Sequence, residues 1–211
     1  MAIETEIKLR IGDTLLPEKL CGDPRVQEYL RAPFRPIQMN SIYYDTADGE
    51  VSRRRWALRL RSEDGVNVAT MKTGGTRSQD GSLFSRNEWQ TEAPSFQEAI
   101  PQLIKLGAPE ELREIVARSP LEERCRVSFV RHSSVLWLPD GVRVDMCVDL
   151  GEIQADGKTE PISELELELL FGPIEPVLEL ARYLTETYGL QNEHVSKYER
   201  ALRLIRSRGT R

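Results

Sequence analysis

The stretch "IETEIKLRI" at residues 3–11 alternates between uncharged, mostly aliphatic residues and charged ones. The charged residues are Glu4, Glu6, Lys8 and Arg10, and they stand at every second position. Because successive side chains of a β-strand point to opposite faces, the pattern predicts a strand with one apolar face and one charged face. The charged face is either wetted by solvent or part of a site, and this stretch alone does not decide between the two.

The composition of the whole chain is that of one soluble domain. Its 211 residues are 39% hydrophobic and 30% charged, and the net charge of −5 gives no global reason to expect a nucleic acid or an anionic membrane as partner. The three cysteines are scattered, and a strand pattern that starts at residue 3 leaves no room for a signal peptide, so we expect a cytoplasmic protein. No apolar run approaches the ~20 residues that a membrane span needs. We expect a single domain over 1–205, with 206–211 as a tail or the start of a linker.

Strand patterns recur along the chain, and helical patterns lie between groups of them. No glycine-rich phosphate loop follows a strand and no βαβ alternation appears, which disfavours a doubly wound parallel sheet and favours an α+β fold of mainly antiparallel strands. We expect helices at 17–30, with a break near "GDP", and at 95–107, 109–119, 173–188 and 196–206. The expected strands are 2–11, 37–45, 56–61, 66–73, 83–93, 124–131, 134–139, 142–149 and 162–170.

In nearly all of these strands, one face carries charged side chains and the opposite face carries apolar side chains. For one antiparallel sheet, a solvent-exposed face is the usual explanation. Here, however, carboxylates dominate the first and last strands, while Arg and Lys dominate the middle strands, and glutamates that share a face repel each other unless a cation lies over them. Amphipathic helices are available to cover the apolar faces, so the pattern favours a barrel with a charged lumen. The candidate lumen residues are Glu4, Glu6, Lys8, Arg59, Arg61, Lys72, Arg86, Glu88, Arg143, Asp145, Asp149, Glu164, Glu166 and Glu168.

A lumen of this kind points to particular ligands. Carboxylates without nearby His or Cys suit the hard cations Mg²⁺ or Mn²⁺, and several Arg and Lys side chains suit a polyanion such as a phosphate chain. A divalent metal beside a basic wall is what phosphoryl transfer requires. In "ERCRVSFVR", Arg124 and Arg126 share one face and Arg131 lies on the other, and parity does not settle which of them enters the lumen.

The order of these motifs resembles the CYTH domain family, the triphosphate tunnel metalloenzymes. The resemblance rests on E-x-E-x-K at residues 4–8, followed by "YYDT", "LRLR", the Lys of "ATMKT", R-x-E in "SRNEW", "VDLGEI", "ELELEL" and "SKYERAL", and it spans essentially the whole chain. It implies an eight-stranded antiparallel β-tunnel. Members of the family hydrolyse inorganic tripolyphosphate, thiamine triphosphate or nucleoside triphosphates, and some cyclise ATP.

The resemblance also implies roles for individual residues. A metal-bound or carboxylate-positioned water, not a side chain, would be the nucleophile. The implied metal ligands are Glu4, Glu6, Glu166 and Glu168, with Glu164, Asp145 and Asp149 as further or outer ligands. The implied triphosphate contacts are Lys8, Arg59, Arg61, Lys72, Arg86, Arg124, Arg126 and Lys197, with Arg131 as the competitor of Arg124 and Arg126. The residues expected to carry catalysis are Glu4, Glu6, Lys8, Arg59, Lys72 and Lys197.

Within the family, the motif spacing looks most like the bacterial domains that a CHAD domain often follows, which are similar to inorganic triphosphatases. We therefore expect metal-dependent hydrolysis of tripolyphosphate to pyrophosphate and phosphate, with a CHAD domain as a possible neighbour in a longer chain. The alternatives are a thiamine triphosphatase, a nucleoside triphosphatase or adenylate cyclase, a non-catalytic polyphosphate-binding module, and a protein-interaction domain with an exposed charged sheet. Trp56, Trp89 and Trp137 are expected in the core or at the rim, and no motif marks one of them for a nucleobase. Arg10 is placed at the tunnel mouth without a role.

Overall fold

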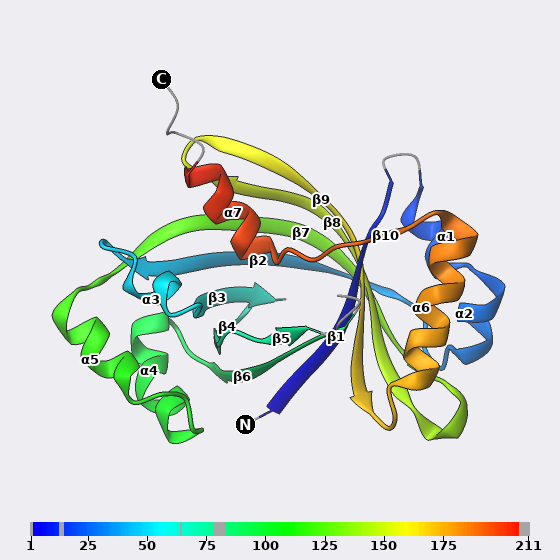
Figure 1. The fold of residues 1–211 in the computed structure, drawn as a ribbon, viewed down its shortest axis with the longest axis horizontal. Helices are drawn as coiled ribbons and strands as arrows, with labels where there is room; N and C mark the ends of the chain where they lie inside the picture. The colour runs from blue at the N-terminus through cyan, green and yellow to red at the C-terminus, as the bar shows by residue number, and fades with distance from the viewer. Residues whose placement is uncertain (1, 13–14, 64, 78–82, 207–211) are drawn as a thin grey trace.

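The strands of the computed structural model pair antiparallel throughout and form one sheet that closes on itself (Figure 1). The structure describes residues 2–12, 15–63, 65–77 and 83–206. Its strands are β1 (Ala2–Arg10), β2 (Arg35–Thr46), β3 (Ala57–Glu63), β4 (Val66–Lys72), β5 (Thr76–Arg77), β6 (Phe84–Glu92), β7 (Leu121–Trp137), β8 (Arg143–Ala155), β9 (Lys158–Phe171) and β10 (Gln191–Asn192).

Closure of the sheet depends on β1, which pairs with β9 on one side and with β6 on the other. The ring therefore runs β1-β9-β8-β7-β2-β3-β4-β6 and returns to β1, while the short strands β5 and β10 pair outside it. This is the predicted eight-stranded antiparallel barrel. A closed ring leaves no unpaired edge among its members, and it separates an inner face from an outer face along every strand.

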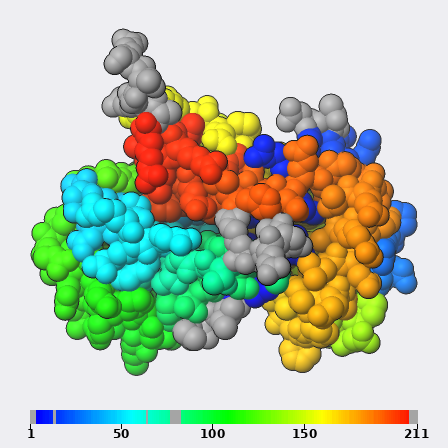
Figure 2. All heavy atoms as spheres, viewed as in Figure 1, coloured from blue at the N-terminus to red at the C-terminus, as the bar shows by residue number. Residues whose placement is uncertain are grey.

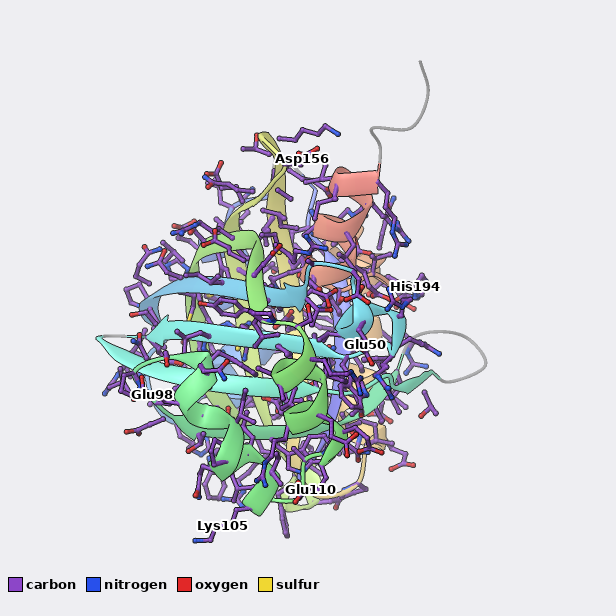
Figure 3. All side chains as sticks on the ribbon, turned by 90° about the vertical axis from the view of Figure 1, so that its left-hand side faces the viewer. Glu50, Glu98, Lys105, Glu110, Asp156 and His194 are labelled. Atoms are coloured by element: carbon purple, nitrogen blue, oxygen red, sulfur yellow. The ribbon has the colours of Figure 1, made fainter. Side chains whose placement is uncertain are left out.

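The apolar outer face is covered by two groups of helices. The helices are α1 (Pro17–Cys21), α2 (Pro24–Tyr29), α3 (Glu50–Arg53), α4 (Phe96–Lys105), α5 (Glu111–Arg118), α6 (Glu175–Tyr188) and α7 (Lys197–Arg206). The core between α1, α2, α6 and the strands β1, β7, β8 and β9 includes Leu9 and Leu184, and the core between α3, α4, α5 and the strands β3, β4 and β6 includes Met71 and Leu103. Charged side chains of the second group, such as Glu98, Lys105 and Glu110, point away from the barrel (Figure 3).

Helix α7 has a different position, because it packs against the inner side of the sheet. A third core joins Tyr198 and Ala201 of α7 to Met39, Val127 and Ile153 of the strands. The helix begins with the predicted capping box, in which the Glu199 N–H donates to Ser196 Oγ and the Ser196 N–H donates to the Glu199 carboxylate. In the space-filling view, the outer side of α7 is exposed at the molecular surface (Figure 2).

The boundaries of several strands differ from the sequence prediction, since β8 extends to Ala155 and β9 begins at Lys158. The strands predicted at 124–131 and 134–139 are one strand, β7, because Ser133 and Ser134 pair with β8 without interruption. The break predicted near "GDP" in the helix at 17–30 is confirmed, since the segment forms two helices and Asp23 caps the second by accepting from the Arg25 and Val26 N–H groups. None of the helices in the described part of the chain is long and apolar enough to cross a membrane.

Candidate active site

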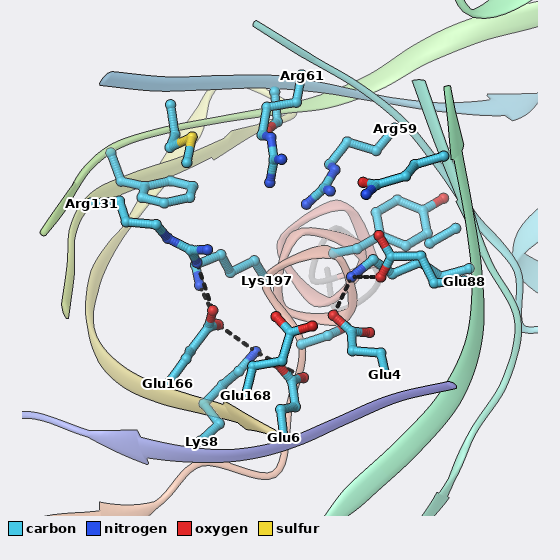
Figure 4. A pocket seen from close by; sticks show the side chains of 18 of the residues that line it. Glu4, Glu6, Lys8, Arg59, Arg61, Glu88, Arg131, Glu166, Glu168 and Lys197 are labelled. Carbon is cyan, nitrogen blue, oxygen red and sulfur yellow. Dashed lines mark hydrogen bonds and ion pairs between the residues drawn. The ribbon is translucent and has the colours of Figure 1, made fainter. Parts of the chain in front are cut away.

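The charged face of β1 points into the barrel, where it lines a cavity of about 330 Å³. Every strand of the closed ring contributes at least one side chain to this cavity, and α7 contributes Lys197 and Tyr198. Figure 4 looks into it, with Lys197 behind the strand residues. The charged lining residues are Glu4, Glu6, Lys8, Arg59, Arg61, Glu63, Lys72, Arg86, Glu88, Arg131, Asp145, Glu166, Glu168 and Lys197.

Strand pairing explains why the two acidic motifs meet. Residues Glu6 and Lys8 of β1 stand directly opposite Glu168 and Glu166 of β9. Directly opposed residues of an antiparallel pair share a face, so "ETEIK" and "ELELE" line the same wall although they lie some 160 residues apart in the chain.

One half of the cavity is a buried network of ion pairs around Glu166. Its carboxylate accepts from Arg131 at 2.6 Å and from Lys197 at 2.8 Å, and Lys8 lies 3.1 Å away. Burial disfavours the charged form of Glu166, but Lys197, Lys8 and Arg131 outweigh it and hold the pKa of this carboxyl well below its ordinary value. Beneath them the fully buried Asp149 accepts from Arg131 and from Lys197, at 2.7 and 2.9 Å. Glu166 is therefore charged, and both carboxylates already have cationic partners.

In the opposite half of the cavity Glu4 is held between two cations. Lys72 Nζ and Arg86 Nε each donate to its carboxylate at 2.6 Å, and Lys72 also pairs with Glu88 at 2.8 Å. Burial opposes ionisation here too, but Lys72 and Arg86 lower the pKa of Glu4 below its ordinary value. Glu6 forms longer ion pairs with described residues, 3.7 Å to Arg86 and 3.9 Å to Lys8.

Two carboxylates of the cavity, Glu168 and Asp145, make no ion pair within the described residues, although Asp145 accepts from Ser133 Oγ at 2.7 Å. Burial, and next the negative charge of Glu4, raise the pKa of Glu168 to about 7. An acid in such surroundings either takes up a proton or attracts a cation.

Arg59 and Arg61 form the basic wall of the cavity, across from Glu4 and Glu168 (Figure 4). The buried Nε atom of each guanidinium lacks a hydrogen-bond partner within the described residues. Arg59 donates to Thr70 Oγ1 at 3.2 Å, and Arg61 pairs with Glu63 at 2.8 Å. Burial, followed by repulsion from Arg59, lowers the pKa of Arg61 to about 10. Two adjacent guanidiniums with spare donors are suited to bind an anion.

The predicted metal ligands do not all lie in one place. Glu164 is 1% exposed and is held by Lys197 and Arg200, and Asp149 lies beneath Arg131, so neither lines the cavity. Within the described ranges, no three Asp, Glu, His or Cys groups are already gathered into a metal site. The available donors are nevertheless only oxygens, as Mg²⁺ or Mn²⁺ prefers, and the uncompensated charge of Glu168 fits a cation beside it.

Two of the predicted phosphate contacts require correction, because Arg124 and Arg126 do not line the cavity. Arg126 lies on the outside, where its side chain is 56% exposed and pairs with Glu123, and Arg124 donates to the Ala47 carbonyl. Arg131 is the arginine of β7 that enters the cavity, because the residues at odd positions of this strand face inward. Arg10 also lies outside the cavity lining, where it pairs with Glu193.

Arg200, which is absent from the predicted site residues, fixes α7 to the barrel. Its guanidinium donates to Glu160, to Glu164 and to the Pro161 carbonyl. Lys197 and Arg200 are three residues apart on one helix and therefore lie on the same face, a spacing that could have indicated a shared acidic partner. Through these two side chains α7 is bound to the carboxylates of β9.

Comparison with known proteins agrees with this geometry. The sequence profile of the CYTH domain matches residues 2–202. An inorganic triphosphatase from Haemophilus influenzae is 25% identical over 205 residues, which are 95% of this chain but only 54% of that protein, so the chain spans about half the length of this relative.

Solved structures show the same fold. The Hippeastrum protein HpAC1, described as having a dominant triphosphatase activity, is 18% identical with a TM-score of 0.61 over 97% of this chain and 95% of that one. The PH1819 protein of Pyrococcus horikoshii is 20% identical with a TM-score of 0.55, over 97% and 99% of the two chains. With the profile match across nearly its whole length, the chain belongs to the CYTH domain family.

Proposed function

We propose that this protein is a hydrolase that cleaves the phosphoanhydride bond of a triphosphate chain inside the barrel, with inorganic tripolyphosphate giving pyrophosphate and phosphate. The observation that carries the proposal is the arrangement of charge in the cavity. Among the described residues, the Nε–H donors of Arg59 and Arg61 on one wall have no partner, and Glu168, which makes no ion pair, stands on the other wall. The cavity thus has an anion-binding wall and a cation-binding wall around one space of about 330 Å³.

The side chains of the cavity have different roles in the proposed reaction. Arg59 and Arg61 donate to phosphate oxygens and hold the chain in place. Lys8, Lys72 and Arg86 are bound to carboxylates in this structure, and they remain close enough to share their charge with a phosphate chain that enters. Fixed positive charge around the transferring phosphoryl group stabilises the charge that develops on its oxygens during the reaction.

The family implies a divalent metal, and the oxygen donors of the cavity fit Mg²⁺ or Mn²⁺. We propose Glu4, Glu6 and Glu168 as the residues that would hold it, with Glu166 next to them. When bound, the metal would neutralise phosphate charge and help to orient the attacking water. The setting that we propose is the reducing cytoplasm, in keeping with three free cysteines, and a CHAD neighbour stays a prediction.

The interior favours an unsubstituted phosphate chain over a triphosphate that carries a ring. Tyr43 is stacked on Tyr198 with 4.9 Å between the ring centroids, and Phe129 lies beneath Arg131 and Lys197. These lining aromatics already have partners, so ring recognition is not built into the cavity itself. The Haemophilus relative, an inorganic triphosphatase, supports the same substrate.

A direct comparison of substrates tests the proposal. Tripolyphosphate, thiamine triphosphate and ATP are supplied with Mg²⁺ or Mn²⁺, and both orthophosphate and cyclic AMP are measured. We expect orthophosphate release from tripolyphosphate and no cyclic AMP from ATP. Cyclic AMP formation would make the protein a cyclase. Tight binding of tripolyphosphate without turnover, under either metal, would make it a polyphosphate-binding module.

A further inference from the structure

A second cavity lies between α2, the turn that joins β7 to β8, and the beginning of α6. It has a volume of about 260 Å³ and shares no lining residue with the charged cavity. Two of its lining residues, Leu138 and Leu180, also belong to the core that packs α2 and α6 on the outer face of the sheet. We call this cavity the proline groove, and its uncharged lining residues are Tyr29, Leu138, Pro139, Pro173, Pro176 and Leu180.

An exposed apolar patch adjoins the proline groove. Trp137 is 48% exposed and Phe171 is 58% exposed, and four of the seven large apolar side chains that are exposed in the described ranges belong to this patch. Chain continuity places the patch beside the groove, because Trp137 directly precedes Leu138 and Phe171 lies two residues before Pro173, where β9 leads into α6 (Figure 1). Exposed apolar groups that gather in this way commonly mark an interaction surface. The aromatic patch consists of Val135, Trp137, Leu170 and Phe171.

Charged side chains of both signs on this surface lack an ionic partner within the described residues. The guanidinium carbon of Arg143 lies 5.7 Å from the ring centroid of Trp137 and 5.0 Å from that of Phe171. Arg25, which lines the groove, lies over the ring of Tyr183 at 4.9 Å. Neither arginine forms an ion pair with a described residue, and the same holds for the carboxylates that line the groove, which are Asp140, Glu175 and Glu179.

A surface that carries exposed apolar groups, cations and anions beside a groove is complementary to a second copy of itself. A two-fold axis brings the same patch of both copies together, so that an exposed ring of one copy meets the groove of the other. Opposite charges then face each other twice, once on each side of the axis. A nucleic acid or a basic peptide would match only one sign of charge, whereas this surface presents two arginines and three carboxylates.

We propose that the aromatic patch and the proline groove form the interface of a two-fold symmetric homodimer. The rings of Trp137 and Phe171 of one copy cover the groove of the other copy, and Arg143 faces the carboxylates of that groove. The arginine is already held between two rings, so little side-chain freedom is lost when it meets its partner. The extent of the surface suits a weak, reversible dimer with a Kd on the order of 10 µM.

Sedimentation velocity from about 1 to about 300 µM protein tests for this dimer. We expect the wild type to pass from the 24.1 kDa monomer to a dimer over this range. The Trp137→Ala/Phe171→Ala variant should associate at least about 10-fold more weakly, because its rings no longer cover the groove. The control is Leu106→Ala, which removes another exposed apolar side chain, 41% exposed at the end of α4, and should dimerise like the wild type.

Charge reversal identifies the surface without relying on a loss alone. Arg143→Glu and Glu175→Lys/Glu179→Lys change side chains that are exposed in the monomer, so both variants are expected to fold, and far-UV circular dichroism checks this. Each variant by itself should stay monomeric, because like charges then face each other across the axis. An equal mixture of the two variants should form a heterodimer, because every facing pair is again of opposite sign.

Three results would overturn the proposal. The first is a wild type that stays monomeric up to about 300 µM, which would leave the surface for a partner other than a second copy. The second is a Trp137→Ala/Phe171→Ala variant that dimerises as tightly as the wild type. The third is a mixture of the two charge-reversed variants that stays monomeric while the wild type dimerises.

Discussion

Replacing Lys197 with Met tests the buried network directly, because one ammonium group holds three carboxylates. Lys197 Nζ lies 2.8 Å from Glu164, 2.8 Å from Glu166 and 2.9 Å from Asp149, and the residue is only 7% exposed. Burial lowers the pKa of this lysine, but Asp149 and the two glutamates raise it well above the ordinary value. Methionine keeps most of the side-chain volume, so the change removes mainly the charge.

The expected loss of stability follows from what remains around the carboxylates. Removing one partner of a buried ion pair costs about 3–5 kcal/mol, and we expect about 3 kcal/mol here. The lower value applies because Arg131 still holds Asp149 and Glu166, and Arg200 still holds Glu164.

The loss depends on pH with a definite sign. The depressed pKa of Glu166 gives stability that is present above its ordinary pKa of 4.5 and is lost only as pH falls through its lower folded pKa. Without Lys197 the Glu166 carboxyl binds a proton more readily. Acid therefore removes the cost of the buried charge in the variant at a pH at which the wild type is still fully ionised at this site. The difference between the two proteins is therefore largest at neutral pH and shrinks in mildly acidic buffer.

Urea denaturation at pH 7 and at pH 4 measures both effects, with Lys105→Met as the control. Lys105 is exposed on α4, and its replacement should change the free energy of unfolding by less than about 0.5 kcal/mol. A loss below about 1 kcal/mol for Lys197→Met, or a loss that is the same at both pH values, would refute the network as described.

Three further predictions concern the cavity walls. In metal-free buffer, Glu168→Gln should stabilise the protein by up to about 3 kcal/mol at pH 8. The reason is that the pKa of Glu168 is raised to about 7, so ionisation of this carboxyl in the folded protein costs stability as the pH rises above 4.5. Thermal melts from pH 4 to 8 should show that the stabilisation by Gln disappears in acid. Arg59→Ala and Arg61→Ala should each weaken tripolyphosphate binding at least about 10-fold without unfolding the protein, and calorimetry that found unchanged affinity would exclude this wall. Arg126→Ala should alter KM for tripolyphosphate less than about 2-fold, because this side chain lies outside the cavity. A larger change would show that Arg126 contacts the substrate after all.

The alternation of charge in the sequence was enough to predict the barrel and the inner face of most strands. Glu4, Glu6 and Lys8 line the cavity as their parity predicts, and so do Glu166 and Glu168. The reason is that the side-chain period of a strand is fixed at two, so a long alternating run leaves little freedom in which face is buried.

The alternation of charge could not predict how deeply each inner residue is buried, or which of several arginines enters the cavity. Asp149 and Glu164 share the inner face with the lining residues, but cations from other strands and from α7 cover them, which only the three-dimensional pairing shows. Parity divided Arg124 and Arg126 from Arg131 without saying which set faces inward. The apolar inner positions Val127 and Phe129, which pack near α7, decide it for Arg131.

In the proposed reaction, the carboxylates of β1 support metal-dependent cleavage of a triphosphate chain. The most direct measurement is the initial rate of orthophosphate release from tripolyphosphate with Mg²⁺ for the wild type, Glu4→Gln, Glu6→Gln and the control Glu152→Gln, whose exposed side chain lies on β8. We predict turnover by the wild type and the control and a fall of at least about 10-fold in each of the other two. Full activity in both Glu4→Gln and Glu6→Gln, or no release by the folded wild type with Mg²⁺ or Mn²⁺, would contradict the account.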